Sequence, residues 1–421
     1  MQFFEIVGGN RLKGKIDING AKNAALPIMA AAILTEGESI LTNVPDLEDV
    51  RSMQVLLHRL GVKAERDAEG ALHLRVEDEM NAHAEYELVS KMRASVCVMG
   101  PLLAKRKRAQ VSMPGGCAIG DRPIDLHILG LQSLGADFEL ANGDVLLRAK
   151  KLKGAEIFLG GPFGSSVTAT ANVMMAAVLA DGRTIIESAA CEPEVVDLAN
   201  YLNACGARIS GHGTPQITID GVEGLKGVPH RVVADRIEAG TYLIAAAITN
   251  GDVQLQGARL EYMRAVVDRL RQMGVIVERG EKGIEVSSSR RLEPVEITTQ
   301  PYPGFPTDLQ AQAMALTCLA EGNSVITEKI FPDRFLHVGE LNRMGAHLRK
   351  EGPTVIVEGV KRLVGAPVMA SDLRASAALV LAGLVAKGTT RVHRIYHIDR
   401  GYERIEEKLT CLGATIRRLD E

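Results

Sequence analysis

Residues 194–207, EVVDLANYLNACGA, contain the pattern that decides the fold of this chain. Apolar side chains recur every three or four positions from Glu194 to Cys205, which predicts an amphipathic helix. Gly206 follows, and we expect it to end the helix in the left-handed conformation that glycine adopts without a steric penalty. Ala207 then leads toward a β-branched segment at 216–219, which predicts a strand.

The same helix ending occurs six times along the chain. Its glycines stand at positions 61, 135, 206, 274, 345 and 413, so that successive glycines are 74, 71, 68, 71 and 68 residues apart. Each is followed by Val or Ala. Self-similarity at a nearly constant period indicates a repeat architecture, and we therefore predict six similar structural units.

A second, more apolar helix is predicted upstream in every unit. Apolar character on nearly all sides is typical of a buried helix, and each segment is shorter than the roughly 20 residues that span a membrane. Five of these helices should be closed by a glycine, at 37, 182, 251, 322 and 388, whereas the second ends in the basic run 105–108. The predicted ranges are 24–34, 94–104, 167–180, 237–249, 309–320 and 373–386.

Length and composition favour two domains. The chain has 421 residues, of which 46% are hydrophobic, and this exceeds what one core usually supports. Three units for each domain place a boundary near residues 227–230. Residues 3–20 precede the first unit and contain strand-like segments at 4–7 and 15–18. From the residues alone, they could belong to either domain.

Charge and cysteine usage exclude several classes of protein. A formal net charge of -3 argues against a nucleic-acid binder. The six cysteines are far apart and form no C-x-x-C pair, which suits neither a zinc site nor a disulfide scaffold. Those at 97, 205, 318 and 411 lie in apolar or helical patterns and are interpreted as inert core residues. Residues 1–5 lack the features of a secretory signal. We expect a reduced, cytoplasmic protein with no membrane segment, metal or cofactor.

Basic residues stand at the predicted starts of four of the six apolar helices. A helix N-terminus carries partial positive charge, so cations there are unfavourable unless an anion binds. We infer that the helix starts form a site for a small ligand with several negative charges. The four residues are Lys22, Arg93, Arg236 and Arg374.

Acidic residues at other helix starts have a simpler explanation. Asp235, Asp308 and Asp372 each precede or open an apolar segment, and capping of the helix is the expected role of each in the absence of other evidence. Arg400 lies in a Gly-interrupted loop, where a surface ion pair with Asp399 or Glu403 would also explain it.

Residues 111–126, VSMPGGCAIGDRPIDL, form the most reactive-looking segment. Its glycines and prolines predict a loop, and a cation near Cys117 would favour the thiolate, making this cysteine a nucleophile or a proton donor. The chain has no G-x-S-x-G elbow and no phosphate-binding P-loop. The histidines at 127, 337 and 397 are interpreted as structural.

Five separate segments together resemble one family. They are Lys22-Asn23, PGGCAIGDRP at 114–123, FPTD at 305–308, DLRAS at 372–376 and HIDRGYE at 397–403. The chain resembles the UDP-N-acetylglucosamine 1-carboxyvinyltransferases, enolpyruvyl transferases of the EPSP synthase-like superfamily that catalyse the first committed step of peptidoglycan synthesis.

The resemblance implies an α/β fold with two inside-out α/β barrel domains facing each other across a cleft. Each domain would hold three helix-strand-helix-strand repeats, with buried helices and outer sheets. Domain I would span residues 22–230, and domain II residues 1–21 and 231–421. The N-terminal segment would then pack with the C-terminal domain.

The resemblance also implies a reaction and roles for its residues. The enolpyruvyl group of phosphoenolpyruvate would move to the 3-hydroxyl of UDP-N-acetylglucosamine by addition and elimination, with release of phosphate. Cys117 matches the proton donor, which is also the residue that fosfomycin modifies, and Asp308 matches the carboxylate held against the sugar hydroxyl. Lys22, Arg122 and Arg400 match the cations that hold phosphate and carboxylate.

Further positions match contacts to the substrates. The expected contacts are Lys22, Asn23, Arg93, Arg122, Pro123, Ile124, Asp125, Leu126, Ser166, Val167, Asp308, Ile330, Arg334, Asp372 and Arg374. The chain departs from a common family pattern at Gly164, where a basic residue is usual, and at Thr168, where glycine is frequent.

Two alternatives remain at this point. The shikimate-pathway enolpyruvyl transferase shares the fold and chemistry but lacks the Pro-Gly-Gly-Cys loop, so Cys117 discriminates against it. The second alternative is an inactive repeat scaffold that only binds nucleotide sugars. The presence of Lys22, Cys117, Asp308 and Arg400 argues against it.

Overall fold

The computed structural model describes residues 2–113, 124–289 and 291–420. The chain forms two compact units. Among the described residues, the first unit comprises 2–19 and 234–420, and the second comprises 20–113 and 124–233. Cys117, Arg122 and Pro123 lie outside the described residues.

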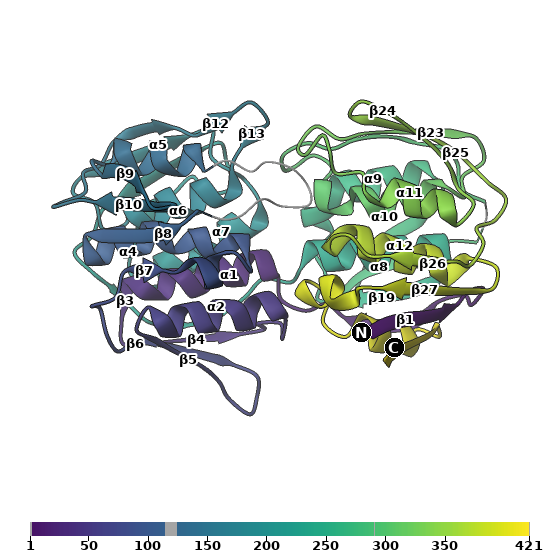
Figure 1. Ribbon diagram of the computed structural model, residues 1–421, viewed down its shortest axis with the longest axis horizontal. Coiled ribbons are helices and arrows are strands. Elements are labelled where there is room, and N and C mark those ends of the chain that lie inside the picture. Colours follow the sequence, from purple (N-terminus) through teal and green to yellow (C-terminus); the bar gives the residue numbers. More distant parts are fainter. Residues whose placement is uncertain (1, 114–123, 290, 421) are drawn as a thin grey trace. The chain divides into compact units, whose positions relative to one another are not determined.

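The six apolar helices are present and buried. Almost every residue of each is inaccessible to solvent, as expected from side chains that are apolar on all sides. In each unit these helices lie inside and strands lie outside (Figure 1). They are α1 (Lys22–Ala31), α4 (Met99–Arg106), α6 (Val167–Ala177), α8 (Arg236–Ile248), α10 (Gln310–Thr317) and α12 (Leu373–Val385).

Short 3-10 segments extend three of the apolar helices. In η1 (Ala32–Leu34) the segment follows α1, whereas η2 (Arg93–Val98) and η4 (Thr307–Leu309) come directly before α4 and α10. The predicted ranges 94–104 and 309–320 therefore each combine a 3-10 turn with an α-helix. The remaining short helical segments are α3 (Tyr86–Val89), η3 (Leu260–Met263) and η5 (Ile395–Arg400).

The amphipathic helices end as predicted. All six repeat glycines, at 61, 135, 206, 274, 345 and 413, have positive φ angles between 76° and 111°. Their helices bury one face only, which matches the 3.6-residue period of the apolar side chains. They are α2 (Glu48–Arg59), α5 (Asp125–Ser133), α7 (Pro193–Ala204), α9 (Arg264–Gln272), α11 (His337–Arg343) and α13 (Ile405–Cys411).

Two details of the apolar helix ends differ from a uniform pattern. Gly37, Gly182, Gly322 and Gly388 have positive φ, but at the end of α8 it is Asn250 (φ 51°), and not Gly251, that takes the left-handed conformation. Asparagine tolerates this conformation better than other non-glycine residues. The apolar helix of the second repeat, α4, ends with left-handed Lys107 (φ 61°), whose ammonium donates to the Ala104 carbonyl at 2.7 Å.

The second unit contains three four-stranded sheets with one common plan. In each, a parallel pair is extended by two antiparallel strands. The orders are β18 (Pro229–Arg231), β4 (Glu38–Thr42), β6 (Leu72–Val76), β5 (Val62–Arg66); β7 (His83–Ala84), β8 (Arg108–Ser112), β10 (Asp144–Arg148), β9 (Asp137–Ala141); and β11 (Glu156–Phe158), β14 (Arg183–Glu187), β16 (Gln216–Asp220), β15 (Arg208–Ser210).

The first unit repeats this plan in three further sheets. The orders are β2 (Lys13–Asp17), β19 (Asp252–Gln256), β21 (Gly283–Ser287), β20 (Ile276–Gly280); β22 (Glu296–Thr298), β23 (Asn323–Thr327), β25 (Thr354–Glu358), β24 (His347–Glu351); and β26 (Pro367–Met369), β27 (Thr389–His393), β1 (Gln2–Val7), β28 (Thr415–Asp420). Two-stranded pairs join β3 (Thr35–Glu36) to β17 (Leu225–Lys226) and β12 (Gly160–Gly161) to β13 (Gly164–Ser165).

Strands from distant parts of the sequence complete three of these sheets. β1 lies between β27 and β28, and β2 pairs with β19, so the N-terminal segment belongs with residues 234–420. In the second unit, β18 comes after the third repeat and pairs in parallel with β4 of the first. In each unit, therefore, at least one sheet is completed by a strand that lies far along the chain from the other strands of that sheet.

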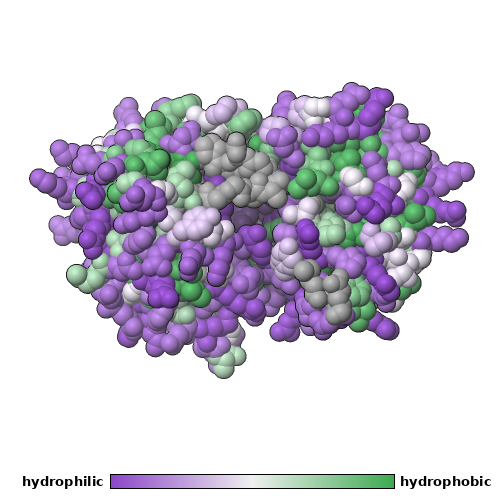
Figure 2. All heavy atoms as spheres, in the orientation of Figure 1, coloured by the Kyte–Doolittle hydropathy of each residue, from purple (hydrophilic) through white to green (hydrophobic). Residues whose placement is uncertain are grey.

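The helices of the described residues are all too short or too polar to cross a membrane. Hydrophilic side chains cover most of the face shown in Figure 2, and apolar ones appear in small groups.

Small residues let the buried helices approach each other closely. Gly100 of α4 lies against Asn172 of α6, and its backbone N–H donates to Asn172 Oδ1 at 2.8 Å. A Cβ atom added to Gly100 would lie 2.2 Å from the Asn172 carbonyl oxygen, which is well inside van der Waals contact. Helix-on-helix packing at this point therefore requires glycine.

We expect Gly100→Ala to lower the free energy of unfolding by about 1–3 kcal/mol, the usual cost of overpacking. Gly224→Ala is the matched control, because a Cβ atom added to Gly224 of the same unit would have no neighbouring atom within 4 Å. Its effect should stay within about 0.5 kcal/mol. Urea unfolding followed by circular dichroism measures both, since the chain has no tryptophan. Equal stability of the two variants would contradict the packing argument.

Candidate active site

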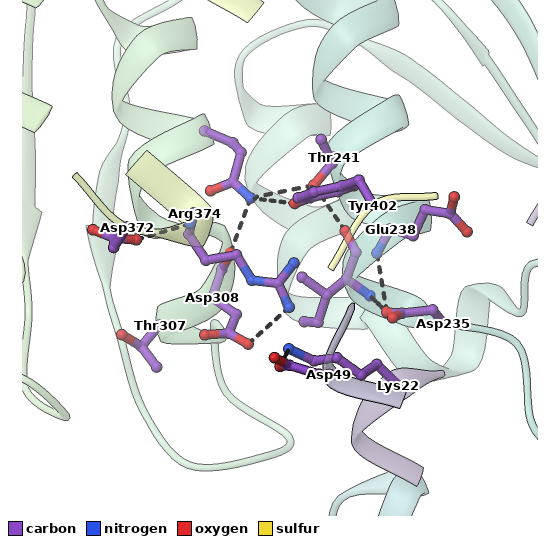
Figure 3. Close-up of polar contacts among 12 residues, drawn as sticks. Lys22, Asp49, Asp235, Glu238, Thr241, Thr307, Asp308, Asp372, Arg374 and Tyr402 are labelled. Atoms are coloured by element: carbon purple, nitrogen blue, oxygen red, sulfur yellow. Dashed lines mark hydrogen bonds and ion pairs between the residues drawn. The ribbon is translucent and has the colours of Figure 1, made fainter. Parts of the chain in front are cut away.

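Asp308 is held by two buried arginines. It lies in η4, at the start of the fifth apolar helix. Its Oδ1 accepts from Arg334 Nη1 at 2.8 Å and its Oδ2 from Arg374 Nη2 at 3.1 Å. Figure 3 shows the Arg374 side chain extending toward this carboxylate. The arginine side chains are 7% and 3% exposed, whereas Asp308 is 27% exposed, so the carboxylate is the member of the cluster that solvent and ligands reach.

The three acidic residues at helix starts have different roles. Asp235 accepts from the backbone N–H groups of Ile237 and Glu238, and Asp372 accepts from those of Arg374 and Ala375. Capping is thus confirmed for these two. For Asp308 it is wrong, because neither η4 nor α10 has a side-chain cap and the Asp308 carboxylate pairs with arginines instead.

A buried polar network supports the same cluster from the helix side. Gln312 of α10 donates through Nε2 to the Asp308 carbonyl at 3.0 Å, to the Tyr402 hydroxyl at 3.1 Å and to Thr241 Oγ1 at 3.2 Å. The Arg374 guanidinium lies 5.3 Å from the centre of the Tyr402 ring, a distance at which the ring attracts a cation. Helices α8, α10 and α12 each supply one polar side chain to this network (Figure 3).

Arg334 has a second partner that links it to a buried carboxylate. Its Nη1 donates to Thr307 Oγ1 at 3.0 Å, and Thr307 in turn donates to Glu328 Oε2 at 2.9 Å. Glu328 is fully buried. It also accepts from the backbone N–H groups of Ile330 and Phe331 at 2.8 and 2.9 Å, so it shapes the turn that carries Ile330.

Arg400 is the last residue of η5 and is partly buried. Asp399, one of the partners considered for it, forms two hydrogen bonds with Arg418 at 2.6 and 3.0 Å. Gly401 follows as the C-cap of η5, and the buried Tyr402 comes next. Residues 395–402 thus contribute both Arg400 and Tyr402 to the first unit.

In the second unit, Lys22 forms a buried ion pair with Asp49. Lys22 opens α1, and its Nζ lies 2.8 Å from Asp49 Oδ2, with side-chain exposures of 10% and 6%. Asp49 was missed in the sequence. Its spacing from Met53 and Leu56 of α2 places an acidic residue on the buried face of an amphipathic helix, which is the signal that could have revealed it.

The other expected contacts of this unit gather at helix starts. Arg93 opens η2 and is partly buried, Asp125 opens α5 and is exposed, and Asn23 is the exposed neighbour of Lys22. Ile124 precedes α5 and is buried, while Leu126 is partly buried. Each of these residues therefore lies at or next to the start of a helical segment.

His127 is structural, as predicted from the sequence. It contacts Asn172 Nδ2 at 2.8 Å and Thr168 Oγ1 at 3.0 Å, and burial together with the charge of Arg93 lowers its pKa to about 3. Ser166 caps α6 by accepting from the Ala169 N–H at 3.3 Å, and Val167 follows as the first helical residue. Gly164 lies in the short pair of β12 and β13.

Comparison with known proteins identifies the family. A family model described as EPSP synthase (3-phosphoshikimate 1-carboxyvinyltransferase) matches residues 6–409. A UDP-N-acetylglucosamine 1-carboxyvinyltransferase from Methylacidiphilum infernorum is 53% identical over 100% of this chain and 99% of the relative, and one from an Anaeromyxobacter species is 55% identical over 98% of both. The chain belongs to the UDP-N-acetylglucosamine 1-carboxyvinyltransferase family. The resemblance inferred from the five sequence segments is thereby confirmed.

Solved structures agree with this family assignment. The enolpyruvyl transferase NikO from Streptomyces tendae superimposes with a TM-score of 0.89 at 25% identity, covering 99% of this chain and 98% of NikO. EPSP synthase from Acinetobacter baumannii gives a TM-score of 0.78 at 21% identity over 100% of both chains, a likeness that concerns the fold alone. The predicted fold class is confirmed.

The thiols of this member of the transferase family fall into two groups. Burial raises the pKa of Cys97 and of Cys318 to about 12, and that of Cys205 to about 11. These three are inert core residues, as predicted. Cys191 is only half-buried, and Cys411 is exposed, so its assignment to the core was wrong. The buried positions of α13 are Ile405 and Leu409, and Cys411 points away from that face.

We expect iodoacetamide at pH 8 to modify Cys411 in the folded protein and to leave Cys97 and Cys318 unmodified. A thiol with a pKa near 12 is a thiolate in only about one molecule in ten thousand at that pH, and the thiolate is the nucleophile. Mass spectrometry of peptides measures each site separately. All sites should react in urea, which is the control. Rapid labelling of Cys97 or Cys318 without denaturant would contradict their burial.

Proposed function

We propose that this protein transfers the enolpyruvyl group of phosphoenolpyruvate to the 3-hydroxyl of UDP-N-acetylglucosamine and releases phosphate, as in peptidoglycan synthesis. The observation that carries the proposal is the identity of 53–55% to transferases of this name over nearly the whole chain. The partly exposed carboxylate of Asp308, which two buried arginines hold in place, supports it.

Asp308 is proposed to accept the proton of the sugar hydroxyl during addition. Each carboxylate oxygen has a further lone pair beyond the one used by its arginine. Because Arg334 and Arg374 hold both oxygens, the carboxylate is oriented before the substrate binds, and orientation of this kind lowers the barrier to proton transfer. The hydroxyl oxygen then bonds to the carbon of phosphoenolpyruvate that carries the phosphate.

Cys117 is proposed to protonate the methylene carbon in the same step, which turns it into a methyl group. Loss of a proton from this methyl group together with the departure of phosphate then restores the double bond. Lys22, Arg122 and Arg400 would bind the phosphate and carboxylate of phosphoenolpyruvate and stabilise the charge that develops on them. Atoms and electrons balance without a redox carrier, because one C–O bond forms and another breaks. We therefore propose that no cofactor takes part.

A further set of residues, several of them at helix starts, is proposed to bind the nucleotide sugar. Backbone N–H groups and basic side chains at a helix N-terminus both favour phosphate. The proposed contacts are Asn23, Arg93, Arg122, Pro123, Ile124, Asp125, Leu126, Ser166, Val167, Ile330, Arg334, Asp372 and Arg374. The Ser166 hydroxyl already caps α6, so the backbone is its more available group.

Organisation and location complete the proposal. We propose two domains with boundaries near residues 21 and 230, close to the limits of the two compact units. We also propose a cytoplasmic location, since the five described cysteines are free thiols, as expected in a reducing compartment.

We expect the purified protein to release phosphate only when phosphoenolpyruvate and UDP-N-acetylglucosamine are both present. The family model is described as EPSP synthase, so shikimate 3-phosphate is the comparison substrate and should give no release. Cys117→Ala, assayed in parallel, should be inactive if the thiol is the proton donor. Release with shikimate 3-phosphate alone, or none with either acceptor, would overturn the proposal.

Asp308→Asn should reduce kcat by about 10²–10⁴-fold, the usual contribution of a general base, while binding of UDP-N-acetylglucosamine measured by calorimetry is largely kept. The change preserves the shape of the side chain and removes the charge. Asp220→Asn is the matched control, because Asp220 forms an ion pair with Arg183 at 2.7 Å on the exposed sheet of the second unit. Its kcat should equal that of the wild type. An active Asp308→Asn enzyme would exclude Asp308 as the base.

A further inference from the structure

Glu328 is a fully buried carboxylate whose hydrogen-bonding partners are all uncharged groups. Among the described residues, no lysine or arginine forms an ion pair with it. A buried carboxylate without a counter-ion is costly unless hydrogen bonds satisfy its lone pairs. Four donors do so here, and they come from two separate parts of the candidate site.

Glu328 Oε1 organises the turn after β23. It accepts from Thr299 Oγ1 at 2.7 Å and from the backbone N–H groups of Ile330 and Phe331 at 2.8 and 2.9 Å. Thr299 Oγ1 itself accepts from the N–H of Lys329 at 2.9 Å. The backbone of residues 329–331, which includes the proposed nucleotide contact Ile330, is therefore tied to one carboxylate oxygen.

Glu328 Oε2 determines the direction of a chain of hydrogen bonds that ends at Asp308. Thr307 has one hydroxyl proton, and because a carboxylate only accepts, Thr307 Oγ1 donates this proton to Glu328 Oε2, which lies 2.9 Å away. The Thr307 oxygen is then free to accept, and Arg334 Nη1 donates to it at 3.0 Å. The other proton of the same nitrogen is directed to Asp308 Oδ1 at 2.8 Å.

We propose that Glu328 is a positioning residue, which acts through Thr307 and Arg334 to hold the Asp308 carboxylate in its working orientation and which fixes the Ile330 turn with its other oxygen. This inference rests on the proposed function, because it assigns Asp308 to the reaction. Glu328 does not touch the reacting atoms. Through its two oxygens, Glu328 keeps the proposed base and the proposed substrate-binding turn at fixed positions relative to each other.

The two substitutions Glu328→Gln and Thr307→Val test the chain of hydrogen bonds. The glutamine amide must turn its NH₂ group toward Thr307, since the opposite orientation would direct it at two backbone N–H groups. Thr307 then loses the acceptor for its proton, while the Ile330 turn is kept. Valine removes the hydroxyl and leaves the shape unchanged. Both variants should lose kcat by about 10- to 100-fold, as expected when a reacting group is slightly misplaced.

Three further measurements separate positioning from loss of structure. The KM for UDP-N-acetylglucosamine should change by less than about threefold in both variants, because removing an orientation needed only for the chemical step lowers kcat without weakening substrate binding. Thr307→Ser should recover most of the kcat. Thr327→Val is the matched control on β23, because the Thr327 hydroxyl lies 3.0 Å from Thr354 Oγ1, outside the Glu328 chain of hydrogen bonds. It should keep the wild-type kcat.

The double variant decides whether Glu328 acts through Thr307. If it does, the two losses are not additive, and Glu328→Gln combined with Thr307→Val should be no slower than the more impaired single variant by more than about threefold. Three outcomes would overturn this inference and leave the proposed function intact. They are multiplication of the two losses in the double variant, a wild-type kcat in Thr307→Val, and an equal loss of kcat in Thr327→Val. A wild-type protein that releases no phosphate would instead overturn the proposed function, and this inference with it.

Discussion

Complete burial of the six apolar helices is the constraint on which the rest of the structure depends. A helix that is apolar on all sides must be covered along its whole length, and here neighbouring helices and outer sheets cover it. Only the helix ends can then carry groups for chemistry. This explains why Lys22, Arg93, Asp308 and Arg374 all lie in first turns. The burial of these helices thus accounts both for the tight packing at positions such as Gly100 and for the location of the candidate site residues at the helix starts.

Charges at these buried ends are stable because each has a partner. Lys22 with Asp49, and Asp308 with Arg334 and Arg374, hold opposite charges within 2.8–3.1 Å in places where solvent is largely excluded. Removing one partner from such a group leaves an uncompensated charge, which is far more costly than a missing surface ion pair. The same pairing fixes the direction of both carboxylate oxygens of Asp308, so stability and preorganisation of the site have a common origin.

The repeat glycines made the fold predictable, because a left-handed residue after an amphipathic run has few alternatives. The helix-start cations could be singled out for a related reason, since each contradicts a local rule, whereas the role of Asp308 was expected only from the family resemblance. The contacts of Thr307, Glu328 and Tyr402 were not predictable, because they form only when the chain folds and nothing in the neighbouring residues reveals them. Asp49 was missed as well, although an acidic residue on the buried face of α2 was a signal in the sequence. Residues 114–123, which include Cys117, lie outside the described residues, so their arrangement stays a prediction.

The strands that complete the sheets, β1 and β18, determine the order in which parts of the chain can fold during synthesis. β18 completes the unit of residues 20–233 from within that segment, so this unit has all of its sheets once residue 233 has emerged from the ribosome. β1 and β2 are made first, yet β1 pairs with β27 and β28 near the C-terminus. β1 must therefore stay unpaired until nearly the whole chain exists, whereas β2 can pair once β19 has been made. During translation the middle of the protein folds before either end, and the exposed edges of β1 are the segment that a chaperone would have most reason to bind.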